Sequence, residues 1–238
     1  MVMAAVLLAG CRVDATVRVR VHDDGSGTVT VAVRLDRAAV AAAGGSPAAL
    51  GTSIRLEDLA AGGWAVTPWT AAAGGGATVE LSKPFADPAE LPKVIAELNG
   101  AHGPLRAIRL TRTESFFSVD FATSAVVDLR TVTAGVAADP ELVAALGAHG
   151  VEPAALEAAL TADAASLHVT YAVSLPGGDP HAGTTTGGHR AVVVATSSLV
   201  DRTRQIAVIV AAVLTVLAVL VLVLGALRTR HRRRSTAG

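Results

Sequence analysis

The chain has 238 residues, a length that suits one domain of moderate size, with 51% hydrophobic but only 3% aromatic residues. Its formal charge of zero divides unevenly, because residues 12–200 hold thirteen basic against nineteen acidic side chains. This net-negative body argues against nucleic acid as a partner, and the single cysteine excludes an intrachain disulfide, a zinc finger and a CxxC redox motif.

Residues 1–10 form a short apolar stretch that ends in Leu8-Ala9-Gly10 directly before Cys11. This ending resembles a lipobox, where a signal peptide is cleaved after small residues and the next thiol takes a lipid. The stretch lacks the positive charges that open a signal peptide, which a start codon further upstream would supply. The alternative is a buried thiol, a common state of cysteine. We expect a signal peptide over residues 1–10 and lipidation of Cys11.

Two strands joined by a tight turn are predicted directly after Cys11. Valine and alanine occupy the odd positions of 13–21, polar side chains occupy the even ones, and the alternation resumes over 29–35. Strict period two is typical of a half-buried strand. Residues 23–27 supply turn residues that tolerate positive φ, so the pattern predicts an antiparallel hairpin.

The next hundred residues mix weaker signals. The segment 38–61 is rich in Ala and Gly with little periodicity, apart from a suggestion of a short helix or turn. The runs 64–69 and 77–81, separated by three glycines, predict a second hairpin. Asp87-Pro88-Ala89-Glu90 predicts the start of a helix that ends at Asn99-Gly100, and the alternation over 105–121 predicts further strands.

Two short helices and two strands complete the body. Asp139-Pro140 and Glu152-Pro153 each precede an Ala-rich and Leu-rich segment, which predicts two helices ending near residue 160. Residues 167–175 and 191–196 predict strands on either side of an irregular Gly and Thr loop at 179–190. Residues 12–200 are therefore expected to form an extracytoplasmic α+β domain, with a mainly antiparallel sheet and a few short helices.

Residues 206–227 form an uncharged apolar run, long enough to cross about 30 Å of bilayer core as a helix. The alternative, a buried core helix, rarely stays uncharged on every face. We expect one C-terminal transmembrane helix, followed by a basic tail over 228–238. The positive-inside rule then places that tail in the cytoplasm and residues 12–200 outside, with both ends of the domain at the lipid surface. The arginines that set this topology are Arg228, Arg230, Arg232, Arg233 and Arg234.

Several short motifs in order resemble the LppM-like lipoproteins of actinobacteria. They are the lipobox, Gly25-Ser26-Gly27-Thr28, Gly63-Trp64-x-Val66, Phe85, Leu91 and Leu98, Ser115-Phe116-Phe117, Asp128-Leu129-Arg130, Leu175-Pro176-Gly177 and the apolar run with its arginines. The resemblance implies a mixed α/β exported domain associated with envelope lipids and their glycans, without catalytic activity. The loop at 179–190 departs from the family, in which an Asn and a Trp usually follow the Leu-Pro-Gly turn.

The sequence contains few candidates for metal-binding, phosphate-binding or catalytic residues. His181, His189 and Asp179 match no recognised metal spacing and are read as exposed loop residues. The three glycines at 74–76 lack the Gly-Lys-Ser/Thr of a phosphate loop, and no Gly-x-Ser-x-Gly elbow is present. We therefore expect no catalytic residue, no metal, no cofactor and no enzymatic activity.

Trp64 and Trp69 stand close together in a chain with few aromatic residues. They suggest an apolar groove or a contact with the lipid interface, while packing in the core is the simpler alternative. The expected function is a membrane-anchored lipoprotein domain that binds an envelope lipid or glycolipid. The alternative is a protein-interaction module that couples the exported domain to the basic tail in secretion, division or wall synthesis.

Overall fold

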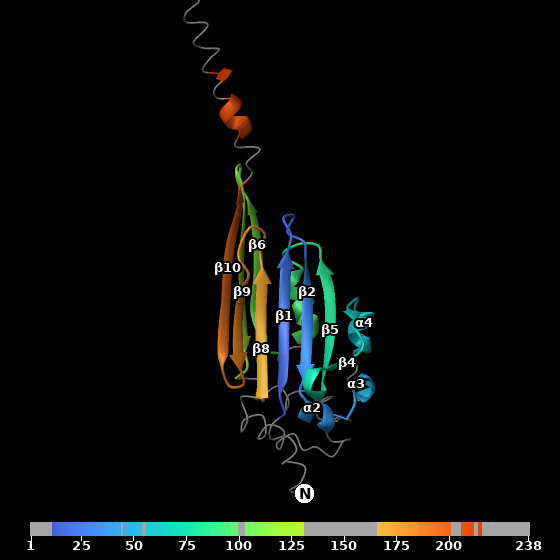
Figure 1. The fold of residues 1–238 in the computed structure, drawn as a ribbon. Coiled ribbons are helices and arrows are strands. Elements are labelled where there is room, and N and C mark those ends of the chain that lie inside the picture. The colour runs from blue at the N-terminus through green and yellow to red at the C-terminus, as the bar shows by residue number, and fades with distance from the viewer. Residues whose placement is uncertain are drawn as a thin grey trace, which may run out of the picture. The chain divides into compact units, whose positions relative to one another are not determined.

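The computed structural model describes residues 11–43, 45–53, 56–99, 103–130, 166–200, 206–211 and 214–215 (Figure 1). The predicted signal peptide, the two helices between 139 and 160, the basic tail with its five arginines and most of the run 206–227 lie outside these residues. The chain divides into two compact units. One contains the residues up to Thr113 together with Asp120–Ser198, and the other contains Glu114–Val119 together with the residues from Leu199 on.

The first predicted hairpin is confirmed. Strands β1 (Val13–Val21) and β2 (Gly27–Leu35) pair antiparallel, with Val13 opposite Leu35. Their turn is closed by Asp24, whose Oδ1 accepts a hydrogen bond from the Ser26 backbone N–H at 2.9 Å. Gly25 adopts a φ of 89°, a conformation that favours glycine.

A seven-stranded sheet grows outward from this hairpin in the order β3-β5-β2-β1-β8-β9, with β4 also paired to β5. Strand β8 pairs parallel to β1, whereas the pairs β1–β2, β2–β5, β3–β5, β4–β5 and β8–β9 are antiparallel. The added strands are β3 (Ala65–Val66), β4 (Thr70–Ala72), β5 (Gly76–Phe85), β8 (Leu167–Ser174) and β9 (His181–Thr186).

One face of this sheet is buried. Its odd-numbered side chains, such as Val19, Val79 and Tyr171, are less than 3% exposed. Helix α5 (Leu91–Asn99) contacts β2 and β5, and its Leu91, Val94 and Ile95 are buried. A second, three-stranded sheet has the order β10-β7-β6, from β6 (Leu105–Glu114), β7 (Ser118–Asp128) and β10 (Arg190–Val200).

The two sheets meet closely between β9 and β10. A Cβ added to Gly183 of β9 would lie 2.5 Å from Val193 Cγ2 of β10, so only glycine lets the backbones approach this far. Tyr171, fully buried on β8, lies where burial raises its hydroxyl pKa above the usual value. Valine, leucine and alanine thus build the core with few aromatic side chains.

The predicted fold class, an α+β domain with one transmembrane helix, is wrong. Strands account for 51% and helices for 23% of the structure, which is therefore mostly β-sheet. The helices in the body are short: α2 (Arg37–Ala42), α3 (Pro47–Ser53), α4 (Glu57–Ala61), α5 and the 3-10 turn η1 (Ala73–Gly75). Among the described residues, which include 206–211 and 214–215 of the apolar run, no helix is long and apolar enough to cross a membrane.

The irregular loop predicted at 179–190 is also wrong, because His181–Thr186 form strand β9. Threonines suit an edge strand, and Thr170 and Thr184 bridge β8 and β9 through their hydroxyl groups at 2.9 Å. The turn after β9 is held to the neighbouring strands, since the Gly187 N–H donates to the Leu167 carbonyl at 3.0 Å.

The ends of the domain lie at opposite ends of its strands. Val13, beside Cys11, pairs with Leu167 at the start of β8, whereas Ser174 at the end of β8 pairs with Arg20. A Cβ on Gly178, just beyond that end, would lie 3.0 Å from the Ser197 Cβ of β10. At about 3.3 Å per residue, Cys11 and Ser197 are roughly 25 Å apart along the strands. The two ends of the domain are thus separated by the length of its strands.

Candidate functional site

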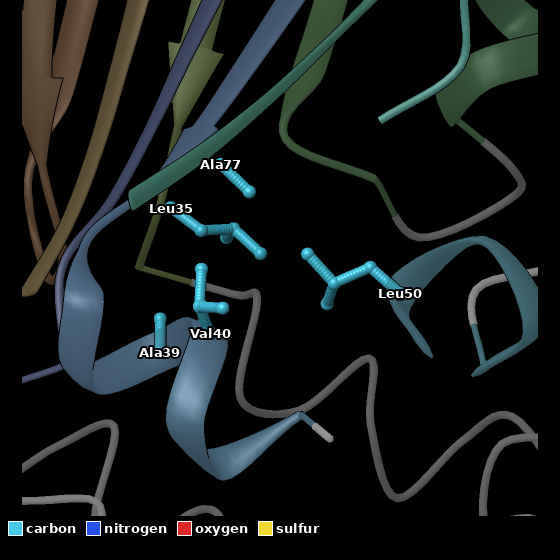
Figure 2. Close-up of a cluster of buried hydrophobic side chains, with 5 residues drawn as sticks. All are labelled: Leu35, Ala39, Val40, Leu50 and Ala77. Atoms are coloured by element: carbon cyan, nitrogen blue, oxygen red, sulfur yellow. The ribbon is translucent and has the colours of Figure 1, made fainter. Parts of the chain in front are cut away.

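Three short helices lie between β2 and β3, and apolar side chains of α2 and α3 form one cluster with side chains of β2 and β5 (Figure 2). Asp36 caps α2, with its Oδ1 accepting from the Ala39 N–H at 2.7 Å, and Ser46 accepts from the Ala49 N–H at 3.2 Å at the start of α3. Figure 2 shows Leu50 of α3 pointing toward Leu35 and Val40. We call this the end cluster: Leu35, Ala39, Val40, Leu50 and Ala77.

An open groove of about 410 Å³ lies over α3, α4 and the segment before β4. Two of its lining residues, Glu57 and Thr67, are polar, and the others are apolar or glycine. We call it the Trp69 groove: Pro47, Ala48, Gly51, Leu56, Glu57, Ala60, Val66, Thr67, Pro68 and Trp69. Its size and apolar lining fall within the range of small-ligand sites.

Trp69 joins the groove to the core. The side chain is half-buried, lines the groove and packs against the end cluster. Its indole Nε1 is buried and has no hydrogen-bond partner among the described residues. Leaving such a buried donor unsatisfied costs about 1–3 kcal/mol of stability. A ligand that accepted a hydrogen bond from this N–H would recover that cost.

Trp64 does not line the groove. It is only 3% exposed, and its Nε1 donates to Glu97 Oε2 of α5 at 2.8 Å. The Lys83 ammonium donates to the same carboxylate at 2.6 Å and also to the Gly62 carbonyl at 2.7 Å. The hydrogen bond from Lys83, and a smaller one from Trp64, lower the Glu97 pKa below its usual value. Trp64, one of the two tryptophans predicted to line a groove, therefore connects the turn after α4 to α5 through Glu97.

Cys11 lies at the groove end of the domain. It is half-buried and packs against the end cluster, as Trp69 does. The structure therefore places the predicted lipid attachment point and the groove on two sides of one apolar cluster. Lipidation of Cys11 stays a prediction, as do the topology roles of the five tail arginines outside the described residues.

A second hollow, of about 790 Å³, lies beside α2, and five of its ten lining residues are charged. Its wall includes Arg12 and Asp14, which form an exposed ion pair at 3.1 Å, and Asp36, which caps α2. The carboxylates of this hollow thus already have partners within the fold. Its charged side chains contrast with the apolar wall of the Trp69 groove, so the two hollows suit different ligands.

His181 and His189, the loop histidines considered as ligands, lie among the described residues. Within the part of the chain that the structure describes, no group of three or more His, Cys, Asp or Glu residues lies close enough to hold a metal. His181 Nδ1 donates to the Asp179 carbonyl at 2.8 Å at the exposed start of β9, and His189 is exposed in the following turn.

Asp128 and Arg130 form a bidentate ion pair that explains one of the short motifs. Arg130 Nε and Nη2 donate to the two carboxylate oxygens at 3.0 and 2.7 Å, and Asp128 is only 7% exposed. The hydrogen bonds from Arg130 lower the Asp128 pKa from 3.8 to about 2. The pair holds the end of β7 beside the β9–β10 turn, where the Leu129 N–H donates to the His189 carbonyl at 2.9 Å.

We expect this pair to produce a pH-dependent stability. The Asp128 pKa is lowered on folding, so its contribution is present above pH 3.8 and is lost as the pH falls toward about 2. The Arg130 side chain is 54% exposed, which limits the contribution to about 1–2 kcal/mol. Asp128→Asn should lower the free energy of unfolding by this amount at pH 7 and flatten its decline between pH 4 and 2 in urea titrations. Asp14→Asn, in the exposed pair with Arg12, should change it little, and an equal change in both variants would contradict the assignment.

Several of the residues behind the resemblance serve the fold. Gly25 and Gly177 adopt positive φ in turns, Gly27 lies against the Phe85 ring, and Asp128 pairs with Arg130. Val66 of the Gly63-Trp64-x-Val66 motif lines the Trp69 groove. No family model, no curated protein and no solved structure matches the chain.

Proposed function

We propose that residues 12–200 form a non-enzymatic, membrane-tethered domain that binds the acyl part of an envelope lipid or glycolipid in the Trp69 groove. The observation that carries this proposal is the groove itself, an apolar hollow of about 410 Å³ in a domain whose described residues contain no metal-binding group. Apolar surface gains about 25 cal/mol for each Å² that a lipid chain covers, so an open apolar wall favours such a ligand.

The wall of the groove suits an apolar chain with one polar end. Glu57 and Thr67 are its only polar residues among the ten that line it, and the Thr67 hydroxyl already bonds the Glu80 backbone at 3.0 and 2.9 Å. The unpartnered Trp69 Nε1 gains a bond if the indole turns toward a lipid carbonyl or sugar hydroxyl. Both features favour a lipid over a charged or strongly polar ligand.

Membrane attachment supplies the ligand at high local concentration. We propose that the uncharged run 206–227 enters the bilayer, with the arginines of 228–238 on the cytoplasmic side, as its composition indicates. A lipid on Cys11 would hold the groove end of the domain at the same surface. Because Cys11 and Ser197 lie at opposite ends of the strands, the two attachments hold the domain from both of its ends.

The full chain, extracted from its own membranes in a mild detergent, tests lipid binding by native mass spectrometry. We expect a co-purified lipid in the wild type and its loss in Gly51→Leu. A Cβ at Gly51 meets no atom within 4 Å, so the new side chain fills the groove without disturbing α3. Trp69→Phe, which keeps the packing but removes the N–H, should weaken retention by roughly three- to tenfold.

Two matched variants control for general effects. Ala41→Leu adds the same side chain at an exposed position of α2 beside the polar hollow, and Trp64→Phe removes the indole that lies outside the groove. Both should retain the lipid. A wild-type chain that repeatedly carries no lipid, or a Gly51→Leu chain that keeps it, would contradict the proposed function.

A further inference from the structure

The turn between β6 and β7 carries two exposed aromatic side chains. Phe116 is 66% and Phe117 is 40% exposed, whereas Phe85 and Phe121, the other phenylalanines, are 3% and 1% exposed. In a chain with so few aromatic residues, half of the phenylalanines thus lie exposed to solvent on one turn. Exposed apolar side chains that lie next to each other are a feature of interaction surfaces.

This turn has a defined structure. The Ser115 N–H donates to the Ser118 carbonyl at 2.8 Å, and the two serine hydroxyl groups lie 2.7 Å apart. The Phe116 and Phe117 rings pack edge to face, with their centroids 4.8 Å apart and an interplanar angle of 86°. The aromatic pair is therefore preorganised, and little conformational entropy is lost when it meets a partner.

The same compact unit contains the chain that leads to the apolar run. Glu114–Val119 groups with the residues from Leu199 on, and β10, which ends at Val200, pairs with β7. Val200 is 51% exposed. Further apolar side chains over 206–214 are exposed as well. The aromatic turn thus belongs to the part of the molecule from which the proposed membrane segment departs.

We propose that the Phe116–Phe117 turn inserts into the interfacial layer of the bilayer that receives residues 206–227. This inference rests on the proposed membrane attachment and adds a second contact beside it. Phenylalanine rings gain from leaving water at the boundary between headgroups and acyl chains. Residues 113–121 contain no Lys or Arg but include Glu114 and Asp120, so the contact is apolar and does not depend on anionic lipid.

Insertion is tested with a single indole placed in the turn of the full chain. Phe117→Trp, and separately Phe116→Trp, are made in a background of Trp64→Phe and Trp69→Phe, and each chain is reconstituted into phosphatidylcholine vesicles with brominated acyl chains. We expect a blue-shifted emission and a loss of fluorescence, larger for bromines near the headgroups than for deeper ones. The loss should persist at high salt, because no ionic attraction is involved. Ala65→Trp in the same background, at an exposed position of the edge strand β3 and away from the Cys11 end, should keep its fluorescence.

Vesicle flotation separates the two possible failures. A chain that does not float with the vesicles overturns both the membrane attachment and the insertion of the turn. A chain that floats, but whose indoles at positions 116 and 117 are not quenched, overturns the insertion alone, and the turn then faces water or a protein. Equal quenching at position 65 also overturns it, because the contact would not be specific to the turn.

Discussion

Replacing Leu50 with Ala is expected to cost about 2–5 kcal/mol of stability and to remove the lipid from the Trp69 groove. Leu50 is completely buried in the end cluster, where it is the residue of α3 that holds the helix against the sheet. α3 also supplies Pro47, Ala48 and Gly51 to the groove. A cavity at position 50 therefore loosens one wall of the site, and urea unfolding with native mass spectrometry measures the two losses.

Leu91→Ala is the matched control for this prediction. Leu91 is equally buried, also on a short helix that packs against the sheet, but α5 contributes no residue to the groove. We expect a similar loss of stability with the bound lipid retained. If Leu91→Ala released the lipid as readily as Leu50→Ala, lipid retention would report general stability and the groove would lose its assignment.

The strands were the most predictable part of the fold. Period two over 13–35 located β1 and β2, and all the odd positions from Val17 to Val21 are buried as expected. This pattern gives the face of a strand but not its neighbour, so the parallel pairing of β1 with β8 remained hidden across more than a hundred residues. Strand order depends on contacts between distant segments, which a local pattern does not contain.

The fold class was wrong because short helices were given too much weight. Asp87 does accept hydrogen bonds from the Ala89 and Glu90 N–H groups, as a cap would, but these residues form a turn and α5 begins only at Leu91. Pro92 explains the delay, since proline suits the first turn of a helix. Capping signals therefore located this helix correctly, yet they say little about how much of the domain is helical.

The groove was only partly predictable. Trp69 stood out because aromatic residues are rare, but the same argument selected Trp64, which bonds Glu97 outside the groove. Most of the remaining wall comes from α3 and α4, of seven and five residues, which are too short to show helical periodicity. The wall forms because Leu50 pulls α3 onto the sheet, a tertiary contact without a sequence signature.

Gly27→Ala is expected to destabilise the domain by about 3 kcal/mol, and so to lower its Tm by roughly 5–10 °C. Gly27 opens β2 between Val21 of β1 and Phe85 of β5. A Cβ there would lie 2.2 Å from the Arg20 carbonyl oxygen and 2.4 Å from the Phe85 ring, and the backbone oxygen cannot move without breaking the sheet. Gly51→Ala is the matched control. With open space around the new Cβ and a helical backbone, it should be neutral or stabilising by up to about 1 kcal/mol. Thermal unfolding of both variants decides the matter, because a Gly27→Ala chain as stable as the wild type would contradict the close packing of β1, β2 and β5 at this turn.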